Sequence, residues 1–156
     1  MGWIKNLKIS KQFKNTLLLE IIEHKPLAIL HFNNQYFYFD QTGNIIDLAN
    51  GIKNIDNLLI FSGQSSNLNA NLILKLLNKS NIDFQNKIYK IEYVEKRRWN
   101  IILKNKIILM LSENYPEDSI NNFLKIKKNL SEEDLSKIKK IDLRNINKTT
   151  IMYKND

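Results

Sequence analysis

The sequence predicts an α+β fold with a mostly antiparallel β-sheet and two main helices. Short runs rich in β-branched and aromatic residues recur along the chain and are separated by turn signals. Two longer segments have apolar residues at helical spacing instead. With 156 residues, of which 43% are hydrophobic and 26% charged, the chain has enough apolar material for one domain or two small ones.

The first third of the chain predicts a β meander. Strands are expected at residues 7–10, 16–23, 27–32 and 35–40. Asp40 and Gly43 mark a turn, because Asp forms local hydrogen bonds and Gly accepts unusual backbone angles. The extended pattern then resumes at residues 44–46.

Two segments predict the main helices. The first lies between residues 62 and 81. Its predicted apolar stripe is Leu68, Leu72, Ile73, Leu76 and Leu77. The second begins at Pro116, a residue that suits the first helical position, and acids follow directly at the positive end of the helix dipole. Ser131 and the three acids after it predict another short helical turn.

The second half of the chain predicts five more strands. Three are expected at residues 87–94, 98–103 and 106–111. Residues 104–106 would close a hairpin, with Asn105 as the residue best able to adopt a positive φ. The last two strands are expected at residues 139–144 and 149–153.

The charge balance is basic but gives weak support for binding to a polyanion. Lys plus Arg outnumber Asp plus Glu by 24 to 16, which leaves a net charge of +8. However, Ile (24), Asn (23) and Lys (21) dominate the composition, and A/T-rich codons encode all three. Part of the basic excess is therefore explained by mutational bias in the source genome.

The sequence predicts no enzyme, metal site or cofactor. It has no Cys and two His, His24 and His31, which are too few ligands for a typical transition-metal site. It lacks a Gly-x-Ser-x-Gly elbow, an ordered triad and a Gly-rich phosphate loop. No window predicts a membrane span, because uncharged stretches such as residues 26–39 are broken by polar residues.

One basic cluster has two interpretations. Lys96, Arg97 and Arg98 directly precede Trp99, and such a combination can hold nucleic-acid backbone and bases. A small basic nucleic-acid-binding domain is thus an alternative function. The other interpretation, which we favour, is a solvated turn before a strand that places Trp99 in the core, because a single cluster is a poor nucleic-acid footprint.

The last predicted strand also has two interpretations. Residues 149–153 are β-branched, apolar or aromatic and lie at the end of the chain, where strands are often edge strands. An edge strand can accept a strand from a partner by β-augmentation. Alternatively, Lys148 and Lys154 guard the edge against such pairing. The residues alone leave both interpretations open.

Several short motifs, in their order along the chain, resemble those of the FtsQ/DivIB family of bacterial cell-division proteins. The motifs lie at residues 3–5, 15–17, 23–28, 40–43, 58–63, 98–111 and 141–144. The resemblance implies two parts: residues 1–26 as the C-terminal remnant of a POTRA module, and residues 27–156 as the family's β domain. It begins partway through the module, so the family's membrane anchor is expected to be absent from this chain.

The resemblance also implies a function without catalysis. Family members are scaffolds that recruit other division proteins, and their last strand pairs with FtsB, which is itself coiled with FtsL. The expected location is the periplasmic side of the inner membrane, with no nucleic acid as partner. The implied partner-binding residues are Lys96, Arg97, Arg98, Arg144, Asn145, Asn147, Thr149, Thr150, Ile151, Met152 and Tyr153.

Some of these residues depart from the family pattern. Asn145 stands where many members have Tyr, Lys148 where Gly is usual, and Tyr153 where the aromatic is often Trp. Arg144 also has a second explanation, because Asp142 lies two residues away on the same strand face and can pair with it.

Overall fold

The computed structural model describes residues 2–13, 15–49 and 58–154. The strands are β1 (Ile4–Gln12), β2 (Thr16–Glu23), β3 (Ala28–Phe32), β4 (Gln35–Phe39), β5 (Ile45–Leu48), β6 (Ile60–Ser62), β7 (Ile88–Val94), β8 (Arg98–Leu103), β9 (Ile108–Leu111), β10 (Ile138–Asn145) and β11 (Lys148–Tyr153). The helices are α1 (Ser66–Lys79), α2 (Ile82–Gln85), α3 (Pro116–Lys127) and α4 (Glu132–Lys137).

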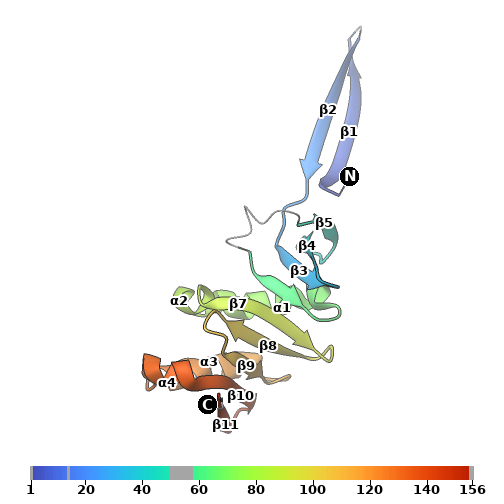
Figure 1. The fold of residues 1–156 in the computed structure, drawn as a ribbon. Coiled ribbons are helices and arrows are strands. Elements are labelled where there is room, and N and C mark those ends of the chain that lie inside the picture. Colours follow the sequence, from blue (N-terminus) through green and yellow to red (C-terminus); the bar gives the residue numbers. More distant parts are fainter. Residues whose placement is uncertain (1, 14, 50–57, 155–156) are drawn as a thin grey trace.

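The strands form two sheets. β1 and β2 make a two-stranded sheet, and the others make a nine-stranded sheet in the order β11-β10-β9-β8-β7-β6-β3-β4-β5 (Figure 1). The predicted α+β class with a mostly antiparallel sheet is therefore confirmed. Three pairs in the large sheet, β9–β10, β3–β6 and β6–β7, are parallel.

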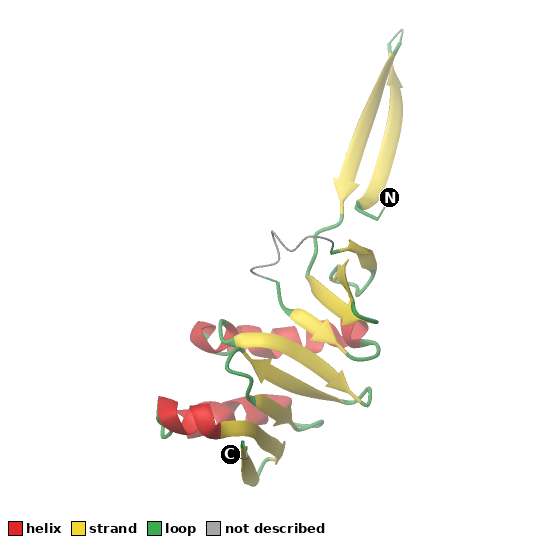
Figure 2. Ribbon diagram, in the orientation of Figure 1, coloured by secondary structure: helices red, strands yellow, loops and turns green. Residues whose placement is uncertain are grey.

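The helices lie on one face of the nine-stranded sheet (Figure 2). α1 contacts β6, and α3 contacts β9 and β10. Alternation within the strands builds the core beneath these helices: in β8, Trp99, Ile101 and Leu103 are buried and the residues between them are half-buried. Burying each such side chain contributes about 1.5–3 kcal/mol to the free energy of folding.

The apolar face of α1 differs from the predicted stripe. Leu68 and Leu72 are each 63% exposed. Ile73 and Leu77 of that stripe are buried, and Leu76 is half-buried against the core. Ala70, which the prediction left out, is fully buried three residues before Ile73, so the buried face runs through Ala70, Ile73 and Leu77. The prediction was therefore right for Ile73, Leu76 and Leu77 and wrong for Leu68 and Leu72.

Two short elements were not predicted. β6 has three residues and inserts between β3 and β7, and α2 is a single turn. Neither is long enough to display a period in the sequence. In the β8–β9 turn, Lys106 rather than Asn105 has the positive φ, at 71°. Asn105 instead accepts a hydrogen bond from the backbone N–H of Ile107 on its side-chain oxygen.

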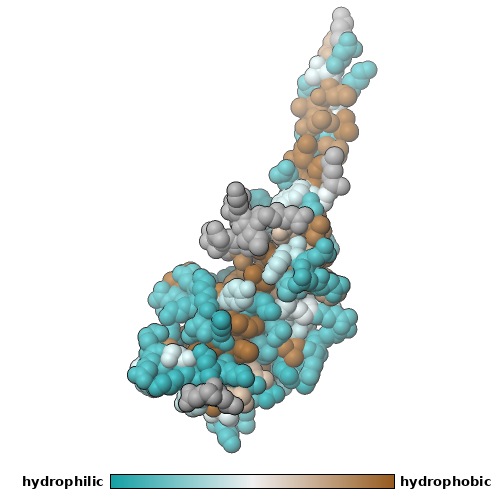
Figure 3. Space-filling model, in the orientation of Figure 1, coloured by the Kyte–Doolittle hydropathy of each residue, from teal (hydrophilic) through white to brown (hydrophobic). Residues whose placement is uncertain are grey.

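The hairpin of β1 and β2 presents an uncovered apolar face. The register pairs Leu7 with Ile21 and Ile9 with Leu19, so these four side chains share one face. All four are 45–58% exposed. Figure 3 shows this concentration of hydrophobic residues on the projecting hairpin.

One aromatic and one polar contact join the base of the hairpin to the large sheet. The Trp3 ring lies 5.4 Å from the ring of Tyr38 in β4, and His24 Nδ1 lies 3.0 Å from a carboxylate oxygen of Asp40. The backbone N–H of His24 donates to the carbonyl of Trp3 (2.8 Å), which joins the two ends of the hairpin. The assignment of residues 1–26 to a POTRA remnant stays a prediction.

Candidate partner-binding edge

β11 is one edge of the nine-stranded sheet. It pairs with β10 on one side, with Ile151 opposite Ile141 and Thr150 opposite Asp142. Thr149 and Ile151 are half-buried toward the core, whereas Thr150 and Met152 are exposed. An edge strand leaves backbone N–H and C=O groups unpaired on its outer side, so β11 offers a row of hydrogen-bonding groups.

One buried and one exposed set of hydrogen bonds hold the β10–β11 hairpin against α3. The hydroxyl of Ser119, which is fully buried, accepts a hydrogen bond from the N–H of Ser112 (3.0 Å) and donates to the carbonyl of Leu143 (2.9 Å). The Asn122 amide donates to the carbonyl of Ile146 in the turn after β10 (3.1 Å). These contacts fix the end of β10, and hence the edge strand, relative to the helix.

The predicted basic cluster forms the β7–β8 turn. Glu95 and Lys96 both have positive φ, and the carbonyl of Lys96 accepts a hydrogen bond from the Tyr93 hydroxyl (2.8 Å). This tight turn directs the side chains of Arg97 and Arg98 back toward Glu95, at 2.7 and 3.3 Å. Sequence order alone gave no indication of this self-pairing.

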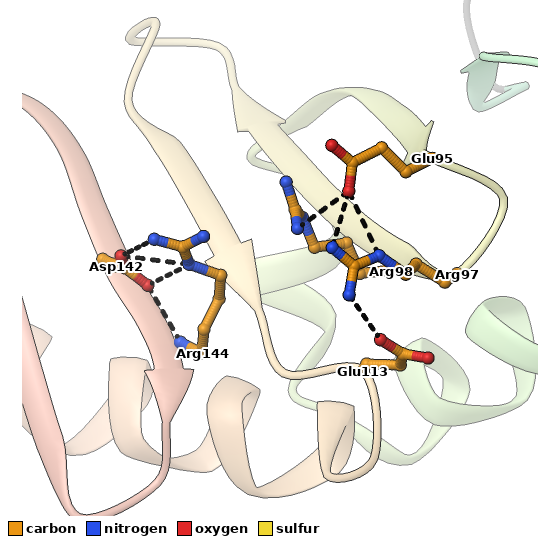
Figure 4. Close-up of polar contacts among 6 residues, drawn as sticks. All are labelled: Glu95, Arg97, Arg98, Glu113, Asp142 and Arg144. Carbon is orange, nitrogen blue, oxygen red and sulfur yellow. Dashed lines mark hydrogen bonds and ion pairs between the residues drawn. The ribbon is translucent and has the colours of Figure 1, made fainter.

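Acidic groups neutralise much of the cluster. Arg97 also contacts Glu113, which precedes α3 (3.2 Å; Figure 4). The hydrogen bond from Arg97 and the charge of Arg98 lower the pKa of Glu95, so Glu95 is ionised at neutral pH. Glu95 and Glu113 are acidic residues of this site that the sequence analysis did not predict. The signal for Glu95 was its place beside three consecutive cations.

Arg144 pairs with Asp142 on the same face of β10. The guanidinium makes hydrogen bonds of 2.5–3.1 Å to both carboxylate oxygens (Figure 4). The hydrogen bond from Arg144 lowers the pKa of Asp142 despite partial burial. The structure therefore contains the ion pair between Arg144 and Asp142 that the sequence offered as a second explanation of Arg144. The pair remains accessible, with Arg144 46% exposed, and such exposed pairs contribute only about 0–1 kcal/mol.

A polar groove brings the two predicted clusters together beside β11. We call it the arginine groove; it has a volume of about 520 Å³. Its lining comes from the β7–β8 turn, the segment before α3, and the β10–β11 hairpin. The lining residues are Arg97, Arg98, Ser112, Glu113, Asn114, Asp142, Arg144, Asn145, Lys148 and Thr150.

The groove collects some predicted site residues and not others. Arg97, Arg98, Arg144, Asn145 and Thr150 line it. The remaining predicted residues lie around it, on the β7–β8 turn, the β10–β11 turn and β11 itself. They are Lys96, Asn147, Thr149, Ile151, Met152 and Tyr153. Lys148 also lines the groove, although it was not among the predicted site residues. The sequence analysis named it only as a departure from the family pattern and as a guard of the edge strand.

Lys148 and Lys154, the proposed guards of the edge, differ in their surroundings. Lys154 is held by two contacts: its backbone N–H donates to the carbonyl of Lys137 and its ammonium to the carbonyl of Ser136 (2.8 and 2.6 Å). It closes the end of β11 against α4. Lys148 is exposed at the start of β11 and lines the arginine groove, where it adds positive charge.

The nucleic-acid interpretation requires an available aromatic ring, and Trp99 does not provide one. Its side chain is buried, stacked on Tyr93 with ring centroids 4.3 Å apart, and it meets the edge of Phe61. A ring in this position cannot stack on a base. Trp99 thus lies in the core, as the favoured interpretation expected.

The described residues offer neither a metal site nor a membrane-spanning helix. Within residues 2–13, 15–49 and 58–154, no group of three or more His, Cys, Asp or Glu side chains is arranged to hold a metal ion. No helix in the same ranges has the length and apolarity needed to cross a membrane.

These features define an α+β domain whose sheet has an open C-terminal edge beside a charged groove. A family model described as "Cell division protein FtsQ/DivIB, C-terminal" matches residues 28–144, which is more than half of the chain. The chain therefore belongs to the FtsQ/DivIB family of cell-division proteins.

Individual members of this family are similar to the chain over most of its length. The "Cell division protein FtsQ" of Rickettsia typhi is 31% identical over 147 residues, covering 94% of this chain and 53% of the relative. The protein of the same name from Bartonella bacilliformis is 28% identical over 151 residues, covering 96% of this chain and 47% of the relative. The chain spans about half the length of the curated relatives it matches.

One solved structure is also similar. It is the major extracytoplasmic domain of the cell-division protein DivIB from Geobacillus stearothermophilus, with a TM-score of 0.46 and 10% identity. The similarity covers 70% of this chain and 99% of that chain.

Proposed function

We propose that the chain is a non-enzymatic scaffold domain of the division machinery that binds an FtsB/FtsL-type partner by β-augmentation at β11. The observation that carries this proposal is the position of β11 as an open sheet edge directly beside the arginine groove. Backbone hydrogen bonds from the edge would provide affinity, and the charged groove would select an acidic segment and fix its register.

The ion pairs within the groove are compatible with such binding. Arg97 and Arg144 are each about half exposed and pair with exposed or half-buried acids, so a partner carboxylate can replace these contacts at small cost. Four cationic and two acidic side chains line the groove, which leaves it net positive. The intramolecular pairs hold the guanidinium groups in place before the partner arrives.

The test is a titration of the 156-residue chain with a peptide from the C-terminal region of FtsB of the same organism. Deleting residues 149–156 should weaken binding at least about 100-fold, since it removes the accepting strand. A melting curve would establish that the deletion leaves the domain folded. Unchanged binding by the folded deletion variant would refute the β11 assignment.

The second edge of the sheet supplies a matched control. Replacing Thr150→Pro in β11 interrupts strand pairing at the proposed edge, and Asp47→Pro does the same in β5 at the opposite edge. We expect only the substitution in β11 to weaken peptide binding. Equal losses in both variants would indicate a general effect on folding.

The contribution of the groove's charge to partner binding can be tested separately, by measuring association rates at several salt concentrations. Arg144→Gln and Arg97→Gln should each lower the association rate about 2–10-fold at low salt, with the difference shrinking as salt is added. Lys125→Gln, on the exposed side of α3, removes the same charge away from the groove and should have little effect.

The proposal also covers the cellular location of the domain and the origin of its first 26 residues. We place the domain on the periplasmic side of the inner membrane and assign residues 1–26 to the end of a POTRA module. Membership in a cell-division family supports the first assignment, and the separate β1–β2 sheet, outside the matched residues 28–144, supports the second. Labelling of an introduced surface cysteine by a membrane-impermeant reagent in intact cells with a permeable outer membrane would test the location.

A further inference from the structure

A second hollow lies at the opposite end of β8 from the arginine groove, where residues of α2, α3 and α4 meet. We call it the lysine pocket. Its volume is about 210 Å³, and its apolar lining consists of Phe84, Leu103, Phe123 and Leu135. All four are buried within the core, and the rings of Phe84 and Phe123 lie 5.6 Å apart. The floor of the pocket is therefore preformed by rigid core side chains.

Three lysines surround this apolar floor, and Asn105 and one acidic residue, Glu132, complete the lining. Lys87 precedes β7, Lys104 follows β8, and Lys127 ends α3. The N–H of Lys104 donates to the carbonyl of Lys87 (2.8 Å), which fixes two of the three backbones side by side. In the described part of the chain, no ion pair joins any of the three to a carboxylate.

The pocket carries net positive charge, because three lysines and one carboxylate, Glu132, line it. Burial, together with the neighbouring Lys87, lowers the pKa of Lys127. Glu132 in α4 and Asp83 in α2 oppose this shift, but they do not cancel it. An anion placed between Lys87 and Lys127 would relieve their repulsion and compensate the lost hydration.

We propose that the lysine pocket binds a small amphiphilic organic anion: a carboxylate held by Lys87, Lys104 and Lys127, with an apolar body on the phenylalanine floor. The size fits this class, because an apolar cavity of about 150 Å³ suffices for benzene. The pocket is larger than that and opens toward the lysines. A ligand of about ten non-hydrogen atoms should bind with a dissociation constant on the order of 1 mM or lower.

The probe is octanoate, followed by ¹H–¹⁵N NMR of the 156-residue chain. We expect saturable shifts of the amides around Phe84, Leu103 and Leu135. Octan-1-ol tests the apolar contribution alone, and inorganic phosphate tests the charge alone; both should bind at least about 10-fold more weakly than octanoate. Equal binding of octan-1-ol, equal binding of phosphate, or the absence of saturable shifts with octanoate would each overturn the proposal.

Single substitutions test which lysines hold the carboxylate of octanoate. Lys127→Gln and Lys104→Gln should each weaken octanoate binding about 10-fold, because each removes a charged hydrogen bond. Lys125→Gln, two residues earlier on the exposed side of α3, is the control and should bind as the unaltered chain does. Equal affinity in Lys127→Gln and Lys125→Gln would contradict the assigned role of Lys127.

A pH titration gives an independent measurement. Lys127 loses its charge at a lower pH than an ordinary lysine, so octanoate binding should weaken as the pH rises through its lowered pKa. The Lys127→Gln variant should lack this early loss. A pH profile that is the same in both chains would contradict the proposal.

Discussion

The β1–β2 hairpin and the β7–β8 hairpin have similar sequence patterns and different surroundings. Both are antiparallel pairs rich in apolar residues. In β8 the apolar residues Trp99, Ile101 and Leu103 are buried, whereas every residue of β2 is exposed. The apolar content of a strand sequence therefore does not reveal whether its side chains are covered, because the tertiary structure determines that.

The largest expected effect tests the core that covers the β7–β8 hairpin, through Phe61 of the adjacent strand β6. Phe61 is fully buried and meets Phe39 and Trp99 edge-on, with ring centroids 5.8 and 5.9 Å away. Phe61→Ala should lower the free energy of unfolding by about 3–5 kcal/mol, because it leaves a cavity in the core. Urea denaturation measures this loss.

The hairpin provides a chemically identical control. Phe13 is 91% exposed at the end of β1, so Phe13→Ala should change the unfolding free energy by less than about 0.5 kcal/mol. Losses of similar size in the two variants would contradict the contrast between the regions.

A smaller loss is expected at the end of β6. Gly63 has a φ of 97°, and a Cβ built there would lie 2.1 Å from the carbonyl oxygen of Tyr93. Gly63→Ala should destabilise the domain by about 2–3 kcal/mol through backbone strain and steric overlap. Gln64→Ala, at the exposed neighbouring position, should be nearly neutral in the same denaturation experiment.

The junction between hairpin and sheet should give a pH-dependent effect. Desolvation raises the pKa of Asp40, but hydrogen bonds from Thr42, Asn44 and His24 outweigh it and leave the pKa lowered. The ionised carboxylate therefore stabilises the fold above its unfolded pKa of about 3.9, and this contribution is lost as the pH falls through the lowered folded pKa.

Asp40→Ala tests this linkage. It should lower stability by about 1–2 kcal/mol at pH 7, because it removes the acceptor of the Thr42 and Asn44 hydrogen bonds. Denaturation curves at pH 7 and pH 3 should differ less for the variant than for the unaltered chain. An unchanged pH dependence would show that Asp40 is not the responsible group.

The smallest effect is expected in the hairpin itself. Leu19 is 55% exposed opposite Ile9, so Leu19→Ser should change stability by less than about 0.5 kcal/mol. Ile101→Ser, at a fully buried strand position, serves as the contrasting variant and should be strongly destabilising. A loss above about 1.5 kcal/mol for Leu19→Ser would mean that the apolar hairpin face is covered in solution.

Local patterns predicted most of the elements but few of the contacts between them. Turn chemistry correctly located the Asp40–Gly43 turn, whose Gly43 has a φ of 84°, and the helix start at Ser131, where a capping box forms. The parallel pairing of β6 with β3 and β7 was not predictable, because it joins segments distant in the chain and has no period of its own.

For the candidate site, too, the sequence predicted the individual segments but not how they come together. Its cations and its strand were visible as a basic run and a β-branched segment. Their convergence in one groove depends on the parallel pairing of β9 with β10, which brings Arg144 close to the segment after β9. The pairing of Arg97 with Glu113 likewise spans elements whose relative positions the sequence does not state.

The strand order has a consequence for folding kinetics. The five antiparallel pairs of the large sheet join strands that are consecutive in the chain and connected by short loops, so they can form through local contacts. The three parallel pairs, β9–β10, β3–β6 and β6–β7, must each close a much longer segment of chain before they gain any contacts. Since β6 takes part in two of these three pairs, we expect its docking to limit the folding rate, and substitutions in β6 to slow folding more than those in β11.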